Sequence, residues 1–198
     1  MFTKAPTFPD AHSRWAAGTL GMRVFLLSLV VLFGAAVIGY VTLRMTAPAT
    51  PGALPRLPRG LWLSTLLLLA GSATVQGALG AARRDRQQRL RACLTATALL
   101  GVSFLAVQAA CWIAWSGPMA EALRGAGQVY LLTGFYVLTG LHGLHVTGGL
   151  VPLLVVTSRA RAGRYSANNH AGVSYMATYW HFLDAVWLVL FATLLLST

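Results

Sequence analysis

Long, nearly uncharged apolar runs separated by short polar segments dominate the pattern along this chain. We expect five such runs, at residues 21–43, 60–82, 92–116, 126–157 and 171–196. A helix of about 20 apolar residues crosses a hydrocarbon core of roughly 30 Å, and each run reaches that length. The pattern therefore predicts an all-α bundle of five transmembrane helices, with residues 1–198 forming a single membrane domain.

The composition favours a membrane protein over a soluble one. Hydrophobic residues make up 57% of the chain and charged residues 10%, whereas a typical soluble domain carries about 25% charged residues. The first apolar run is long enough to span and follows a mixed, polar segment, so we interpret it as a permanent helix rather than a signal peptide. Cys93 and Cys111 fall about 27 Å apart on one predicted helix, too far for a disulfide, and we interpret them as packing residues.

The basic residues predict the orientation of the five spans. If the connecting segments alternate between the two sides, one side collects Lys4, Arg14, Arg23, Arg83, Arg84, Arg86, Arg89, Arg91, Arg159, Arg161 and Arg164, and the other collects Arg44, Arg56, Arg59 and Arg124. The positive-inside rule then places the N-terminus in the cytoplasm and the C-terminus in the periplasm, across a bacterial inner membrane. Nucleic acid is not expected as a partner, because these residues sit in short segments between spans.

Four ionisable residues are candidates for chemistry within the membrane: His142 and His145 in the fourth span, and His181 and Asp184 in the fifth. Each pair is spaced three residues apart and so shares a helix face. They could ligate a haem or metal, handle protons, or form a neutral hydrogen-bonded network between the two spans. We favour the structural network, because a di-metal site needs several carboxylates, a proton path needs a chain of acids, and the spans contain one acid.

Small and amide side chains indicate how the helices pack. Thr139, Gly143 and Thr147 recur every four residues in the fourth span, which predicts a central, closely packed helix or a lipid contact. Gln76 and Gln108 lie at membrane depth, and we expect both to face other helices as hydrogen-bond partners.

Two longer motifs carry a family resemblance. The fourth span reads Thr139-Gly-Leu-His142-Gly-Leu-His145-Val, and the fifth reads Tyr179-Trp-His181-Phe-Leu-Asp184-Ala-Val-Trp187. Both stretches resemble the signature helices of the cytochrome c oxidase subunit III family of haem-copper oxidases, in the family's order. The similarity extends to Gly21-Met22, Leu61–Thr65 and Leu100-Gly101. Larger members have seven helices, and this chain resembles short bacterial members that lack the first two.

The resemblance implies an accessory subunit with no catalytic centre, haem or metal of its own. Such a subunit packs on subunit I of a terminal oxidase that reduces oxygen and translocates protons, binds phospholipid, and supports stability and sustained turnover. Subunit II and a small subunit are further candidate partners. In this interpretation His142, His145, His181 and Asp184 hold the last two spans together. Trp180 and Trp187 fill their interface or line a lipid site.

The chain departs from the family pattern at three positions. Leu29, Cys111 and Ser174 stand where the family usually has glutamates. A role in proton uptake linked to the first of these acids is therefore not carried over. The departures keep open an alternative, an accessory membrane protein of a nitric oxide reductase system with the same fold. The electron donor, cytochrome c or quinol, also stays open, because donor sites lie on other subunits.

Overall fold

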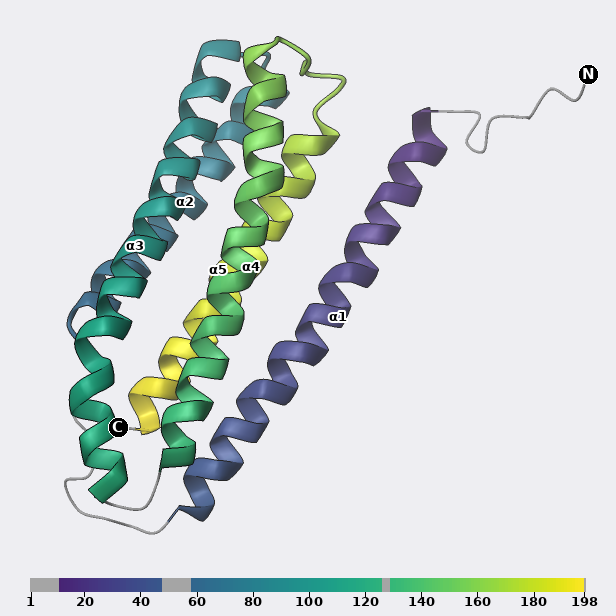
Figure 1. The fold of residues 1–198 in the computed structure, drawn as a ribbon. Coiled ribbons are helices and arrows are strands. Elements are labelled where there is room, and N and C mark those ends of the chain that lie inside the picture. Colours follow the sequence, from purple (N-terminus) through teal and green to yellow (C-terminus); the bar gives the residue numbers. More distant parts are fainter. Residues whose placement is uncertain (1–10, 48–57, 126–128, 198) are drawn as a thin grey trace, which may run out of the picture.

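The protein is described here by a computed structural model that covers residues 11–47, 58–125 and 129–197. These residues form five α-helices: α1 (Ala11–Thr46), α2 (Gly60–Arg83), α3 (Gln87–Gly125), α4 (Val129–Arg161) and α5 (Ala171–Ser197). All five are long and apolar enough to cross a membrane, which confirms the all-α, five-span fold within the described part of the chain (Figure 1).

Several helices extend beyond the predicted spans. Helix α1 begins at Ala11, well before residue 21. Helix α3 continues through Pro118 to Gly125, although its apolar portion ends at Ala114. A proline within a helix removes one backbone donor, and Pro118 itself is exposed. The start predicted for the fourth span, residues 126–128, lies outside the described residues.

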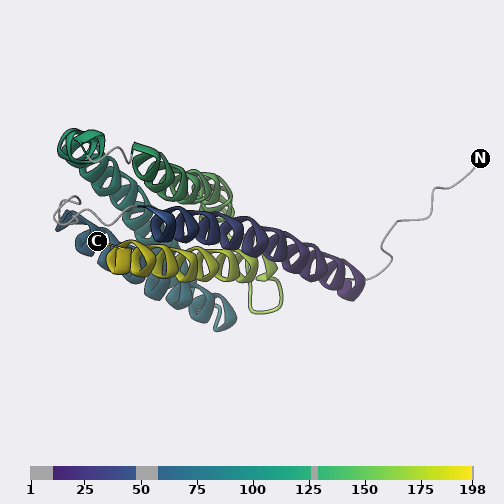
Figure 2. The same ribbon diagram turned by 90° about the horizontal axis from the view of Figure 1, so that it is seen from below.

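The bundle consists of an antiparallel α2–α3 hairpin against an α4–α5 pair, with α1 laid along the latter. Helix α4 contacts α1, α3 and α5, and helix α5 contacts α1, α2 and α4. Among the described residues α1 contacts only α4 and α5. Its N-terminal half leans away from the bundle (Figure 1), and α5 runs between α1 and α2 when seen from below (Figure 2).

Two helix ends at the arginine-rich side of the bundle close in the same way. After α2, Asp85 adopts a left-handed conformation with φ of 55°, and the amides of Asp85 and Arg86 bond back to Ala82 and Ala81. After α4, Gly163 has φ of 68°, and Gly163 and Arg164 bond back to Ala160 and Arg159. At each helix end, the two back-bonds satisfy two of the carbonyls that the end of a helix leaves free.

Large aromatic side chains pack against glycines of neighbouring helices. The Trp180 indole of α5 lies between α2 and α3, where a Cβ added at Gly71 or Gly101 would come within 3.1 Å or 2.8 Å of its ring. Tyr179, also on α5, packs against Gly149 of α4 in the same way. Because lipid tails are as apolar as the side chains, close approach of this kind is what holds membrane helices together.

We expect Gly101→Ala to destabilise the protein by about 1–3 kcal/mol, because the new methyl group would overlap the buried, rigid Trp180 ring. Gly80→Ala is the matched control, since nothing lies within 4 Å of its added Cβ. That variant should gain about 0.5–1 kcal/mol from helix propensity. Thermal unfolding of the purified chain in mild detergent checks both, and equal midpoints for the two variants would contradict the packing described here.

Candidate functional site

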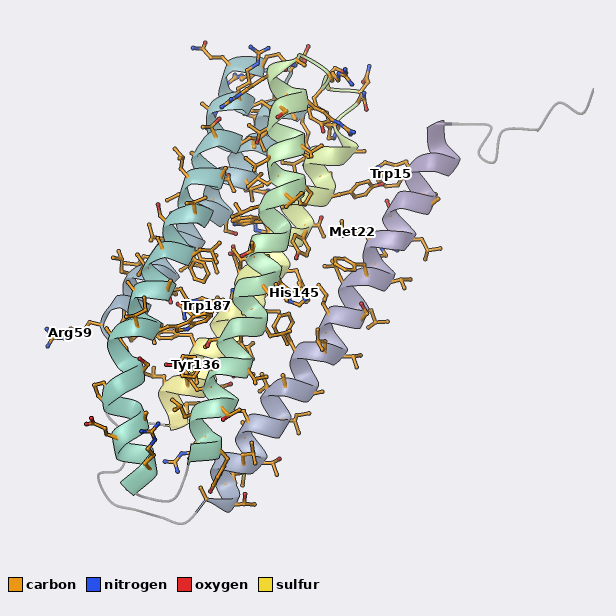
Figure 3. All side chains as sticks on the ribbon, in the orientation of Figure 1. Trp15, Met22, Arg59, Tyr136, His145 and Trp187 are labelled. Carbon is orange, nitrogen blue, oxygen red and sulfur yellow. The ribbon has the colours of Figure 1, made fainter. Side chains whose placement is uncertain are left out.

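One side chain from each of the five helices meets at the centre of the bundle. This central cluster comprises Phe33 (α1), Thr65 (α2), Phe104 (α3), His142 (α4) and Trp187 (α5), all of them buried. The His142 ring lies 5.1 Å from Trp187, 5.8 Å from Phe104 and 6.2 Å from Phe33, measured between ring centroids. Figure 3 shows Trp187 pointing into the bundle from α5. Interlocking rings of this kind fix the relative positions of the helices.

The polar atoms of the central cluster are only partly paired. The indole nitrogen of Trp187 donates a hydrogen bond of 2.9 Å to the Thr65 hydroxyl, which joins α5 to α2. The Thr65 hydroxyl in turn donates to the backbone carbonyl of Leu61 at 2.8 Å. Both ring nitrogens of His142 are buried and make no hydrogen bond with the described residues. His142 therefore contributes here through ring packing.

A second group, the polar cluster, lies between α2 and α5. It comprises Ser72 and Gln76 of α2 with His181 and Asp184 of α5. The Ser72 hydroxyl lies 2.5 Å from Nδ1 of His181, and Oε1 of Gln76 lies 3.1 Å from Nε2 of the same ring. A neutral imidazole has one donor and one acceptor, so Nε2–H donates to Gln76 and Nδ1 accepts from Ser72.

Asp184 lies beside the Ser72 hydroxyl and is 5% exposed. Its two carboxyl oxygens are buried and make no hydrogen bond of good geometry with the described residues. The polar cluster thus ties α5 to α2, whereas the sequence analysis expected His181 and Asp184 to bond the fourth span.

His145 lies on the side of α4 that faces α1 (Figure 3). Its Nδ1 bonds the carbonyl of Leu141 one turn earlier at 2.7 Å, and its ring packs edge-on to Phe33 at 5.1 Å. The Tyr179 hydroxyl donates to the His145 backbone carbonyl at 2.9 Å, and this bond links α5 to α4. His145 and His142 thus both contact the last helix, but through different partners.

His145 and Tyr179 also line an apolar groove of about 680 Å³ between α1, α4 and α5. The groove follows the part of α4 from Leu144 to Arg159, about 22 Å at 1.5 Å per residue. Its walls are otherwise apolar or aromatic, and Arg159 is its one basic residue, at the end where α4 finishes. The groove lies where the N-terminal half of α1 leans away (Figure 1).

The small residues predicted to pack α4 have different surroundings. Thr139 is buried and donates to the Phe135 carbonyl, and an added Cβ at Gly143 would lie 3.7 Å from the Trp112 ring of α3. Thr147 is exposed and bonds back to Gly143. Of the two amides expected to bond other helices, Gln76 bonds His181, but buried Gln108 makes no hydrogen bond with the described residues.

The positions where the family pattern has acids are occupied by packing residues. Leu29 and Cys111 are buried, and the Cys111 sulfur contacts Gly60, where an added Cβ would collide with it. The other cysteine, Cys93, lies against Gly77 at an added-Cβ distance of 3.4 Å. Ser174 is half-buried near the start of α5, and its carbonyl accepts a hydrogen bond from Thr178. Both cysteines thus pack α3 against α2.

The four ionisable residues therefore have three separate surroundings. His142 packs among aromatic rings, and His145 lines the groove. His181 and Asp184 lie against α2. Within the described residues, no three histidine, cysteine, aspartate or glutamate side chains gather as metal ligands would. What this arrangement does directly is hold helices together, through rings in the central cluster and hydrogen bonds in the polar cluster.

The convergence of Thr65, Phe104 and Trp187 was not apparent from the sequence. Their spacing along the chain carries no signal of contact, because residues in three different helices meet only through the bundle's geometry. Ser72 was likewise not identified as a partner of His181. A polar residue on an apolar helix, four positions before Gln76, is the signal that could have suggested a shared face.

Comparisons with known proteins agree on one family. The family model described as cytochrome c oxidase subunit III matches residues 7–197. The cytochrome c oxidase subunit 3 of Thermostichus vulcanus is 32% identical, over 95% of this chain and 91% of that protein. That of Synechocystis sp. is 34% identical, over 86% of this chain and 72% of that protein. A probable cytochrome c oxidase subunit 3 of Rickettsia felis is 30% identical, over 87% of this chain and 66% of that protein.

A double-mutant cycle should reveal the bond between Trp187 and Thr65. We expect the double variant Trp187→Phe/Thr65→Val to lose about 0.6–1.5 kcal/mol less unfolding free energy than the two single variants lose in sum. The reason is that either single change already breaks the bond. Trp112→Phe with Thr65→Val is the control cycle, since the Trp112 indole nitrogen has no partner among the described residues. Unfolding free energies in detergent give both coupling terms, and equal coupling in the two cycles would refute the bond's contribution.

Proposed function

Because this chain belongs to the cytochrome c oxidase subunit III family, we propose that it serves as the non-catalytic subunit III of a bacterial terminal oxidase. The match over residues 7–197 carries the proposal, since it includes every described helix. The oxidase names of the relatives, bacterial ones among them, favour this role over the nitric oxide reductase alternative. The complex would reduce oxygen and translocate protons, with haem and copper held by partner subunits.

The chain's own contribution would be structural. Its central cluster and polar cluster supply contacts between helices, and His142 and Asp184 are buried within them. We infer that the protein packs on the haem-bearing subunit I, with subunit II and a small subunit as further neighbours, and helps the complex stay active over many turnovers. A rigid bundle suits that role, because an interface keeps its shape only if the helices that form it do.

Charge supports an N-terminus on the cytoplasmic side of the inner membrane. The start of α1, the α2–α3 turn and the α4–α5 connection lie at one end of the bundle, and the C-terminal end of α5 lies at the other (Figure 1). The first end carries most of the basic residues, including five arginines between Arg83 and Arg91. Such an excess is typical of cytoplasmic segments and supports the proposed orientation.

We further propose that phospholipid binds in the groove between α1, α4 and α5. The apolar walls suit acyl chains, and Arg159 at the membrane-surface end suits a lipid phosphate. The length of about 22 Å along α4 exceeds half the thickness of a hydrocarbon core, roughly 15 Å. One leaflet's acyl chains would therefore fit along the groove with the headgroup at Arg159.

The proposed function predicts that a tag after Thr198 retrieves an oxidase from native membranes in mild detergent. A reduced-minus-oxidised spectrum of the eluate should show haem bands, and a large haem-bearing subunit should co-purify, while the isolated chain stays colourless. An untagged strain is the control. Bands of haem b and c together with nitric oxide reductase subunits would replace the oxidase with its alternative, and a haem spectrum from the single chain would overturn the non-catalytic role.

The lipid proposal predicts that Gly148→Leu lowers the amount of co-purified phospholipid several-fold. Nothing lies within 4 Å of a Cβ at Gly148, which lines the groove, so the leucine side chain would occupy the lipid's space. Gly80→Leu, equally free of neighbours but outside the groove, is the control. Native mass spectrometry of the detergent-purified chain counts the bound lipids, and equal lipid content in the two variants would rule out binding in this groove.

A further inference from the structure

The polar cluster reaches the outer surface of the bundle. His181 is half-buried, and Gln76 is exposed on α2. Gln76 is seven residues from Arg83 at the end of the same helix, so it lies about 10 Å along α2 from the end of this candidate membrane span. A polar side chain exposed at this depth faces hydrocarbon unless protein covers it.

The amide of Gln76 has unused donors. Its oxygen accepts from Nε2 of His181, and its NH₂ group makes no hydrogen bond with any described residue. An acyl chain offers no acceptor at this depth, because the oxygens of a phospholipid sit at the membrane surface. The free N–H groups therefore call for an acceptor from another polypeptide, such as a backbone carbonyl, hydroxyl or amide oxygen.

A second, smaller apolar groove adjoins this polar surface. It has a volume of about 350 Å³ and is formed by α1 and α5, with Gly34 and Ala185 among its lining residues. Ala185 is exposed and follows His181 by one helical turn, so the groove and the polar cluster share one side of α5. Helix α5 runs between α1 and α2 (Figure 2), and Ala185 and Val189 on this side of it are exposed. We name it the α5 outer face, comprising Gln76, His181, Ala185, Val189 and the α1 residues Gly34 and Ile38.

We propose that the α5 outer face docks one transmembrane helix of the haem-bearing partner subunit. Apolar side chains of that helix fill the α1–α5 groove, and an oxygen at the depth of Gln76 accepts the amide hydrogens. The small residues Gly34 and Ala185 allow the two backbones to approach closely. The larger groove beside Arg159 differs, because it ends in a basic residue and suits a headgroup, whereas no charged residue lines this one.

The identity of the partner rests on the proposed function, but the location of the face does not. In the tagged complex, a photo-crosslinking residue placed at Ala185 should crosslink to the haem-bearing subunit upon illumination. The same residue at Leu99, exposed on the outer side of α3, is the matched control and should not. Crosslinks from Ala185 only to lipid or to a second copy of this chain, or crosslinks to the haem-bearing subunit from Leu99 only, would overturn the proposal.

A steric block gives an independent readout. Ala73 is exposed on α2, three residues before Gln76, so Ala73→Trp obstructs an approaching helix while leaving the hydrogen bonds of the polar cluster in place. We expect at least tenfold less haem per tagged chain than with Ala106→Trp, the control at an exposed alanine of α3. Unchanged unfolding midpoints of the purified chains exclude misfolding as the cause.

The docking face and the proposed oxidase role can be refuted separately. Equal haem retention in Ala73→Trp and Ala106→Trp would refute the docking face while leaving the oxidase role intact. If the wild-type chain itself retrieves no haem-bearing subunit, the proposed function fails instead. A crosslink from Ala185 to a transmembrane protein without haem would then keep the face as an interface but reject the partner named here.

Discussion

Trp187 contacts side chains from three other helices, and the arrangement of the bundle depends on these contacts. Its indole nitrogen bonds Thr65 of α2, while its rings meet Phe104 of α3 and His142 of α4. Through His142 the same cluster reaches Phe33 of α1. In hydrocarbon, apolar side chains gain little by leaving lipid, so helix association depends on shape and on the few polar bonds available. A buried tryptophan with one hydrogen bond supplies both.

The same constraint explains why large and small residues alternate at the helix contacts. Trp180 lies against Gly71 and Gly101, and Tyr179 lies against Gly149. Each aromatic ring fills the space that a missing side chain leaves, which gives dense packing without requiring similar helices. The cysteines follow this rule as well, since each sulfur lies against a glycine of α2. Packing is therefore the role of Cys111, at a position where the family resemblance suggested an acid.

Helix α1 is the least enclosed part of the bundle, and the proposed lipid and docking sites both border it. Along one edge it forms the larger groove that ends at Arg159, and along the other it forms the smaller groove beside Ala185. Both arise because α1 contacts only α4 and α5 in the described part of the chain. A subunit that must bind lipid on one side and a partner on another needs such surfaces, which a fully closed bundle would not offer.

The five spans, the all-α fold and the family followed from the sequence, because apolar length and the Tyr179–Trp187 and Thr139–Val146 motifs are local properties of the chain. The partners of individual residues did not. His181 bonds Ser72 and Gln76 of α2 rather than the fourth span, and Gln108, expected to bond another helix, makes no hydrogen bond with the described residues. Hydrophobicity determines which segments enter the membrane but not how each helix is rotated about its axis. That rotation depends on which rings fit against which glycines, and only the tertiary structure decided it.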